Sequence, residues 1–281
     1  MNENSKPKAP LTIRKWLEAA HDELDAAGIQ SSRLDAELLL AYALDVDRTW
    51  LHAHSDDTLP PAIARRATKL SARRARRIPL SYLTGTREFY GRSFIVNSDV
   101  LIPRPESETL IDLSKSYKLT GRLLDVGCGS GALGLTLARE LPISLTLSDI
   151  SHTALAVARR NARALGVTPV RYVHSDLLAH WLSHAKPKPF DAIVANLPYV
   201  DESWERSPET DHEPALALFA GHHGLDLIYT LLEQIPRVLK PGGYVLLEAD
   251  PEQHARIVAR ATQNSLRLET VREYIVVLTK P

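Results

Sequence analysis

A short run in the second half of the chain combines the residue types needed to bind a planar nitrogen and hold it for reaction. It consists of Asn196, Leu197, Pro198 and Tyr199, and it follows an apolar run, 190–195, that predicts a buried strand. The lone pair of an amide or aniline-type nitrogen is delocalised, so acceptors on both N–H bonds are needed to orient it and raise its electron density. The side-chain oxygen of Asn196 and the carbonyl of Leu197 would be those acceptors. Pro198 would fix the loop and Tyr199 would pack on the flat group, and no strong base is required because alkylation makes the proton acidic.

A glycine-rich turn is the second candidate site. It reads Asp125-Val126-Gly127-Cys128-Gly129-Ser130-Gly131 between an apolar run and a helical pattern, which predicts a strand, a tight turn and a helix. Glycine lets the backbone approach a ligand closely and accepts a positive φ where the chain reverses. Asp149 ends the next strand-like run, about where an acid accepts hydrogen bonds from ribose hydroxyls. We therefore expect a nucleoside ligand across these two strand ends.

The charge at this turn favours S-adenosylmethionine (SAM) over NAD as the ligand. Gly127-x-Gly129-x-x-Ala132 satisfies the dinucleotide fingerprint, but the Asp125 carboxylate would repel a pyrophosphate and attract a cationic amine. Gly131 completes a D-x-G-x-G-x-G run that resembles the first motif of SAM methyltransferases. The predicted cofactor is SAM, with S-adenosylhomocysteine as its product, and NAD is the alternative.

Strand-like and helix-like segments alternate from about Leu119 onward, which predicts a parallel sheet covered on both faces. Strands are expected at 122–126, 144–148, 170–174, 191–195, 243–248 and 273–279, and helices near 131–140, 151–165, 223–239 and 251–263. Ligands of such sheets bind at the carboxyl ends of the strands. Asp125, Asp149, Asp176 and Asn196 all come at or just after such ends. We expect Asp176 to contact the adenine amino group.

Residues 11–79 predict a small helical domain that would serve substrate recognition or packing, since they carry helical spacing and no catalytic pattern. The expected signals are a helix stop at Gly28, a capping box at Ser32 and Asp35, a third helix near Asp47, and a fourth from Pro60-Pro61 through Arg77. Basic residues without any acid fill 65–77. This run is either a solvated basic face or a contact for an RNA-rich or acidic partner, and no aromatics interleave it for base stacking.

A linker follows at 80–102, where alternating residues and turn residues predict a β-hairpin. The methyltransferase-like domain then spans 103–281. It opens on a rigid bend in which Pro105 can begin a helix through Leu113. Arg104, Glu106 and Glu108 lie on this bend, and a role in the site is favoured over a surface ion pair because the bend precedes the cofactor domain.

Length and composition bound the class of protein. The 281 residues allow a large domain and a small one, and a net charge of zero gives no overall attraction to nucleic acid. The single cysteine, Cys128, excludes an intrachain disulfide and fits a cytoplasmic location. No apolar run approaches the roughly 20 residues of a membrane span. Residues 1–10 are expected to be disordered, and no metal site or membrane partner is predicted.

From about Pro79 to Gln253 the chain resembles the release factor glutamine methyltransferase family, the HemK/PrmC type. The matching segments are 79–85, 89–91, 100–108, the glycine-rich turn, 196–199, 212–214 and 221–227. The hairpin and the Ile-Pro-Arg-Pro segment are far more specific than the glycine motif. The resemblance implies an α/β fold: a Rossmann-like class I SAM methyltransferase sheet, mostly parallel with an antiparallel last strand, after a helical N-terminal domain and a hairpin linker.

The resemblance also implies a reaction and its site. The substrate would be the glutamine of the Gly-Gly-Gln motif of peptide chain release factors, and the product N5-methylglutamine. Cofactor contacts are expected at Asp125, Gly127, Cys128, Gly129, Ser130, Gly131, Asp149, Asp176, Leu177 and Asn196. Catalytic and substrate contacts are expected at Asn196, Leu197, Pro198 and Tyr199, with Arg104 and Glu108 as further substrate contacts. Nucleic acid is not expected as a substrate.

The chain departs from the family pattern at Leu197, where the family has a second proline, at Leu177, where it has an aromatic residue, and at 248–251, where it has a glycine-containing turn. Asn-Leu-Pro-Tyr also resembles the rRNA adenine dimethyltransferases. An rRNA or DNA adenine amino-methyltransferase and a ribosomal protein glutamine methyltransferase are therefore the alternatives. A non-catalytic scaffold is a further alternative, which Asp125, Asp149 and Asn196 argue against.

Overall fold

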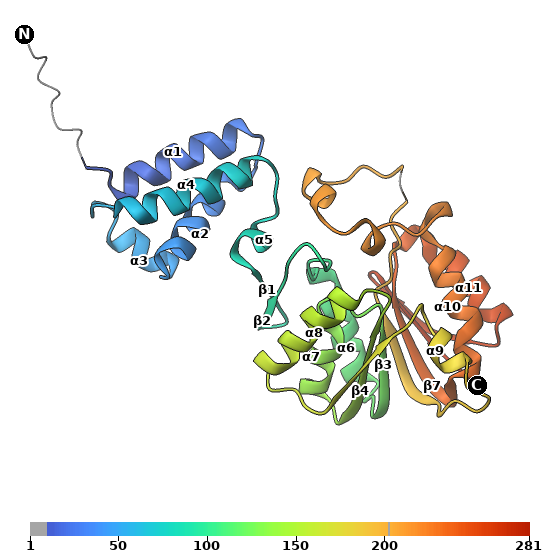
Figure 1. Cartoon of the computed structure of the whole chain (residues 1–281). Coiled ribbons are helices and arrows are strands. Elements are labelled where there is room, and N and C mark those ends of the chain that lie inside the picture. The colour runs from blue at the N-terminus through green and yellow to red at the C-terminus, as the bar shows by residue number, and fades with distance from the viewer. Residues whose placement is uncertain (1–9, 202) are drawn as a thin grey trace, which may run out of the picture. The chain divides into compact units, whose positions relative to one another are not determined.

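The structure is a computed structural model that describes residues 10–201 and 203–281. The chain divides into two compact units (Figure 1). The first, the helical unit, ends at Gly85 and also includes Pro208–His212. The second, the sheet unit, comprises Thr86–Ser207 and Glu213–Pro281. Except for Pro10, the segment expected to be disordered lies outside the described residues.

The helical unit is built from short amphipathic helices. They are α1 (Ile13–Ala26), α2 (Ser32–Leu44), α3 (Arg48–Ala53), α4 (Pro61–Ala75) and α5 (Leu80–Thr84). The apolar faces of α1 to α4 meet in one core that includes Trp16, Leu24 and Leu40. The prediction of a helix near Asp47 is confirmed, because the Asp47 side chain accepts a hydrogen bond from the Trp50 backbone N–H at 2.7 Å and caps α3.

The capping box predicted at Ser32 and Asp35 is wrong. Helix α2 begins at Ser32 itself, and its N-cap residue, Ser31, makes no side-chain capping bond. Asp35 Oδ1 accepts a hydrogen bond from Ser31 Oγ at 2.9 Å, and its Oδ2 pairs with Arg74 Nε at 2.6 Å. The carboxylate serves a tertiary ion pair because the buried guanidinium of Arg74 needs a charged partner.

The basic run at 65–77 is divided by the fold between buried and exposed positions. Helix α4 ends at Ala75, and Arg77 follows it with a φ of +66°, off the helical face expected for it. Arg74 and Arg77 both pair with Glu209 of the helical unit, at 2.9 and 3.0 Å. The exposed basic residues of α4 are Arg65, Arg66, Lys69 and Arg73. Part of the charge is thus neutralised internally, and a role for the rest in binding a partner stays a prediction.

The sheet unit contains a seven-stranded sheet in the order β5-β4-β3-β6-β7-β9-β8. The strands are β3 (Gly121–Val126), β4 (Ile143–Asp149), β5 (Val170–His174), β6 (Phe190–Ala195), β7 (Leu239–Glu248), β8 (Arg267–Arg272) and β9 (Ile275–Thr279). Neighbouring strands from β5 to β7 are parallel, and β9 is antiparallel to both β7 and β8. The predicted mostly parallel sheet with an antiparallel last strand is confirmed. Strand β8 was not predicted, because it is a largely exposed edge strand without an apolar alternation.

Helices cover both faces of this sheet (Figure 1). One face carries α6 (Glu108–Ser116), α7 (Ala132–Glu140) and α8 (His152–Ala164), and the other carries α9 (Ala179–Leu182), α10 (Asp226–Gln234) and α11 (His254–Gln263). Successive side chains of a strand point to opposite faces. Accordingly Leu123 and Val194 pack in one core, while Leu124 and Ile193 pack in the other. Burial on both faces explains the continuous apolar runs of β3 and β6.

The predicted hairpin forms over a shorter range than 80–102, since α5 takes up 80–84. It consists of β1 (Thr86–Phe89) and β2 (Arg92–Ile95), which are antiparallel. Phe89 and Phe94 meet edge to face, with ring centroids 6.1 Å apart, in the core of the sheet unit. Asn161 of α8 bonds the backbone N–H and carbonyl of Ile95 at 2.7 and 3.0 Å. The hairpin is therefore fixed to the sheet unit.

Short 3-10 turns complete the fold. They are Pro105–Ser107, Pro208–His212, Ala215–Ala217, His222–Gly224, Ile235–Arg237 and Pro251–Gln253. The first leads directly into α6, so Pro105 does begin a helical segment as predicted. Within the described ranges, no helix is both long and apolar enough to cross a bilayer.

Candidate active site

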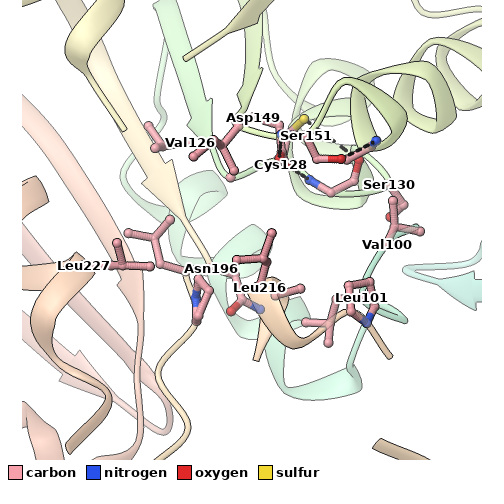
Figure 2. A pocket seen from close by; sticks show the side chains of 18 of the residues that line it. Val100, Leu101, Val126, Cys128, Ser130, Asp149, Ser151, Asn196, Leu216 and Leu227 are labelled. Atoms are coloured by element: carbon pink, nitrogen blue, oxygen red, sulfur yellow. Dashed lines mark hydrogen bonds between the residues drawn. The ribbon is translucent and has the colours of Figure 1, made fainter. Parts of the chain in front are cut away.

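A cavity of about 630 Å³ opens at the carboxyl ends of β3, β4 and β6 in the sheet unit (Figure 2). Asp149 from the end of β4 and Asn196 from the end of β6 both line it. This volume lies within the range of sites that enclose small molecules. The two sequence patterns predicted to do chemistry, far apart along the chain, thus share one cavity.

The glycine-rich turn uses its glycines for different reasons. Gly127, Gly129 and Gly131 have φ values of +69°, +52° and +80°, which side chains rarely adopt. A Cβ on Gly127 would also lie 2.9 Å from Leu197 Cδ2, whereas one on Gly129 would meet nothing within 4 Å. Gly127 therefore allows the turn to pack against the 196–199 segment, and Gly129 leaves open space for a ligand. Gly131 does not line the cavity, whereas Gly127, Cys128, Gly129 and Ser130 do.

Asp149 holds the end of β4 to the glycine-rich turn. Its Oδ2 accepts a hydrogen bond from the Gly129 N–H at 2.9 Å, and its Oδ1 accepts one from the Ser151 N–H at 2.8 Å. Burial raises the pKa of the Asp149 carboxyl, against the lowering effect of these backbone donors. Each carboxylate oxygen has a second lone pair. The group can therefore accept ribose hydroxyls without losing its structural bonds.

Asp125 leaves one oxygen unpaired inside the cavity wall. The residue is 1% exposed, and its Oδ2 accepts the Gly134 N–H at 2.9 Å. Its Oδ1 has no hydrogen-bond partner among the described residues, and burial raises the pKa of the carboxyl to about 7. A buried carboxylate without a partner is costly, and a cationic amine would supply the missing one. This orphaned oxygen fits the amino group of SAM.

The part of the cavity near the predicted adenine contacts includes a further residue, Ile150, that was not predicted. Asp176 and Leu177 both line the cavity, as predicted cofactor contacts should. Ile150 lines it too and is 54% exposed, an unusual position for a large apolar side chain. Its place directly after the acid that ends β4 was the available signal. An exposed apolar side chain at the cavity wall suits contact with a flat base.

Asn196 has a defined amide orientation. Its Nδ2 donates a hydrogen bond to Ser107 Oγ at 3.1 Å, which leaves Oδ1 as the side-chain acceptor. Leu197 and Pro198 also line the cavity, whereas Tyr199 does not. The Tyr199 hydroxyl donates to Glu248 Oε1 at 3.3 Å, and burial raises its pKa. The arrangement presents one fixed amide acceptor to the cavity, and the stacking role of Tyr199 stays a prediction.

The two charged residues expected to touch substrate have other partners. Arg104 pairs with Glu213 at 2.5 Å, and Glu213 also accepts the Ile102 N–H at 3.0 Å. Glu108 Oε1 accepts the Tyr90 N–H at 2.9 Å. Neither Arg104 nor Glu108 lines the cavity, so their contact with substrate stays a prediction. No role was predicted for Ser107, Glu213 or Glu248, which hold the site through contacts distant in sequence.

The fold and the cavity define a class I SAM methyltransferase. A solved methyltransferase from Pyrococcus furiosus shares this fold, with a TM-score of 0.52 and 18% identity over 68% of this chain and 90% of that one. Residues 15–85 match the family described as the PrmC N-terminal domain, and residues 106–212 match the methyltransferase small domain.

Curated relatives narrow the class to one family. The release factor glutamine methyltransferase of Koribacter versatilis is 40% identical, covering 86% of this chain and 89% of that protein. The Deinococcus radiodurans protein of the same description is 37% identical over 89% of this chain and 90% of its own length. The chain therefore belongs to the release factor glutamine methyltransferase family.

Proposed function

We propose that this chain transfers a methyl group from SAM to the side-chain amide nitrogen, N5, of the glutamine in the Gly-Gly-Gln motif of peptide chain release factors. Membership of the family supports this substrate class. The observation that carries the proposal is the Asn196 amide: its nitrogen is held by Ser107, so its oxygen is the acceptor it presents. An acceptor of this kind suits an amide N–H of a substrate glutamine.

The residues present fit the cofactor. Asp125 Oδ1 would accept the amino group, Asp149 the ribose hydroxyls, and Asp176 with Ile150 would hold the adenine. Bound there, SAM supplies a methyl group made electrophilic by its positively charged sulfur. The glycine-rich turn, with open space at Gly129, lets the backbone lie close to the cofactor.

The protein's contribution to the reaction is position and polarity. Asn196 Oδ1 and the Leu197 carbonyl would each accept one N–H bond of the glutamine amide, which orients the nitrogen and raises its electron density. These two acceptors would aim the nitrogen lone pair at the methyl group that bound SAM would supply, with the C–S electron pair staying on sulfur. One amide proton then leaves to water, so no side chain of the site must act as a strong base.

The first experiment incubates the protein with labelled SAM and a release factor, beside a variant of that factor whose Gly-Gly-Gln glutamine is alanine. Label on the wild-type factor alone is the expected result, and it identifies reaction, substrate and target residue together. Such a substrate would place the enzyme in the cytoplasm, where translation ends. Label on neither factor but on ribosomal RNA or a ribosomal protein would overturn the proposal.

Ribosomal RNA is tested as an alternative substrate for a specific reason. Leu197 takes the position where the family has proline, and the resulting Asn-Leu-Pro-Tyr resembles adenine methyltransferases of rRNA. Leu197 is buried in the sheet unit and packs beside Gly127. Its side chain thus belongs to the protein core, and what it offers the substrate is the carbonyl that proline also has. The departure at Leu197 is therefore compatible with the protein substrate.

A further inference from the structure

Glu248 is a buried carboxylate beside the acceptor Asn196 that no step above has used. It ends β7 and is 1% exposed. Its Oε1 accepts the Tyr199 hydroxyl at 3.3 Å, and its Oε2 has no partner in hydrogen-bonding geometry among the described residues. The side chains of Ser107 and Asn196 lie close enough to Glu248 to lower the pKa of its carboxyl. No basic side chain pairs with it among the described ion pairs, so this carboxylate is not explained as half of a salt bridge.

The directions of the hydrogen bonds in this cluster determine which way the Asn196 amide faces. Ser107 has one hydroxyl proton, and its Oγ already accepts from Asn196 Nδ2 at 3.1 Å. The proton must therefore go elsewhere, and an ionised Glu248, which can only accept, is the neighbour suited to take it. The chain of donors then runs from Asn196 to Ser107 to Glu248. In that order the amide nitrogen of Asn196 faces Ser107 and its oxygen is left for the cavity.

We propose that ionised Glu248 is a positioning residue that sets the polarity of Asn196 through the Ser107 hydroxyl, and so decides whether the site offers an acceptor to the substrate amide. A protonated Glu248 can donate to Ser107, whose own proton is then available to Asn196 Oδ1. Asn196 would turn its amide over and present its NH₂ group, which cannot accept an N–H bond of glutamine. This inference rests on the proposed function for its catalytic readout.

The same cluster predicts that kcat depends on pH. Burial raises the pKa of the Glu248 carboxyl to about 7, while the side chains of Ser107, Tyr199 and Asn196 lower it and the charge of Glu106 raises it. Asp250 and Tyr274 help to raise the pKa of the neighbouring Tyr199. Because the ionised form sets the productive polarity, kcat should fall as the pH drops below about 7.

The catalytic test compares three variants with the wild type across pH 5.5 to 9. Glu248→Gln keeps the shape but places an NH₂ donor in the cluster, so we expect kcat to fall at least tenfold, the pH dependence near 7 to disappear, and the SAM Kd to stay within twofold. Ser107→Ala should lower kcat similarly. The double variant should be no slower than the slower single variant, because both changes break one chain of hydrogen bonds.

Matched controls separate this role from a general effect. Glu252→Gln makes the same chemical change at an exposed residue four positions later, and it should keep the wild-type rate and pH profile. His254, whose ring bonds the Ala249 carbonyl at 3.1 Å, is a further titratable group near this strand end. A pH profile that persists in Glu248→Gln would assign the titration to another group and overturn the proposal, as would additive losses in the double variant.

A measurement without substrate keeps the inference distinguishable from the proposed function. In protein labelled with ¹⁵N at asparagine, the side-chain NH₂ signals of Asn196 should shift with pH with a midpoint near 7. The shift should vanish in Glu248→Gln and become smaller in Ser107→Ala, where only the direct effect of Glu248 on Asn196 is left. Signals that ignore pH in the wild type would overturn the polarity relay even if release factor is methylated. Signals that follow it, with no methylation of any release factor, would leave the relay standing and reject the substrate.

Discussion

The two sides of the cavity are held together by different kinds of contact. On the cofactor side, formed by Asp125, the glycine-rich turn and Asp149, carboxylates accept backbone N–H groups at 2.9, 2.9 and 2.8 Å. On the acceptor side, formed by Asn196, Ser107, Tyr199 and Glu248, side chains hold other side chains.

The separations along the chain differ as well. The Asp125–Gly134 and Asp149–Gly129 bonds join residues 9 and 20 apart, whereas the Asn196–Ser107 bond spans 89 positions. The cofactor side is thus built by neighbouring strands and the turn between them. The acceptor side depends on the fold to bring distant segments together. Substitutions there should therefore lower the rate of methyl transfer without weakening SAM binding.

The largest expected effect breaks the acceptor side alone. Asn196→Ala removes one acceptor of the substrate amide and should lower kcat about 100- to 1,000-fold, the range seen when one positioned hydrogen-bond group at a transition state is removed. SAM binding should be unchanged, because the cofactor side keeps its bonds. Single-turnover methylation and calorimetric titration with SAM measure the two effects. Loss of SAM binding in this variant would contradict the division between the two sides.

The reverse result is expected from the cofactor side. Asp149→Ala should weaken SAM binding about 10- to 150-fold, since hydrogen bonds to a charged group contribute roughly 1.5–3 kcal/mol each. Part of this loss will come from the turn, because Gly129 and Ser151 lose their acceptor. Asp149→Asn, which keeps one oxygen, should lose less. Unchanged affinity in Asp149→Ala would reject the ribose role.

The contrast explains what the sequence could predict. Asp125, Asp149 and the turn glycines were identified because a strand, its turn and the next strand lie close in sequence, and these residues do line the cavity or support it. Ser107 and Glu248 were assigned no role because nothing local marks a serine after Pro-Glu, or a glutamate at a strand end, as partners of a distant asparagine.

Prediction of the fold from the sequence was limited in the same way, by contacts between residues distant in the chain. Strands β3, β4, β6 and β9 were predicted because most of their residues are buried and therefore apolar, whereas β8 is largely exposed and has no such pattern. The capping box at Ser32 was wrong for a related reason: Asp35 is used by Arg74, a residue 39 positions away. Local rules succeed where the backbone alone decides, and they fail where a tertiary partner competes for the same side chain.

A smaller effect tests the buried carboxylate of the cofactor side. Asp125 has a pKa raised by burial to about 7. Its ionised form would bind the SAM amine, so the Kd of the wild type should rise roughly tenfold from pH 8 to pH 6, as expected for one site with that pKa. Asp125→Asn should bind more weakly at pH 8 and lose this dependence. Measuring both proteins removes the contribution of SAM's own titration, which they share.

In the absence of SAM, the Asp125 carboxyl predicts the opposite dependence on pH for folding stability: the free energy of unfolding should fall as the pH rises. A carboxyl whose folded pKa lies above its ordinary value of 3.8 binds more protons in the folded state. Its stabilising contribution is therefore complete at low pH and is lost as the pH rises toward 7. Asp125→Asn should flatten that part of the stability profile in urea unfolding. A wild-type stability that rises between pH 5 and 7, with the same slope in Asp125→Asn, would contradict the assignment.

The smallest expected effect restores the family residue on the acceptor side. Leu197→Pro keeps the backbone carbonyl that would accept the second N–H bond, so kcat should stay within about threefold of the wild type, because no transition-state contact is removed. The buried leucine packs beside Gly127, so thermal stability should fall through lost core contacts. Leu197→Ala is the control: it should lose similar stability and also keep its rate. A loss of more than a hundredfold in Leu197→Pro alone would mean that the loop geometry set by leucine, and not the carbonyl, is what the reaction requires. Methylation of the release factor with the wild-type rate in both variants would remove the main reason for assigning this chain an RNA substrate.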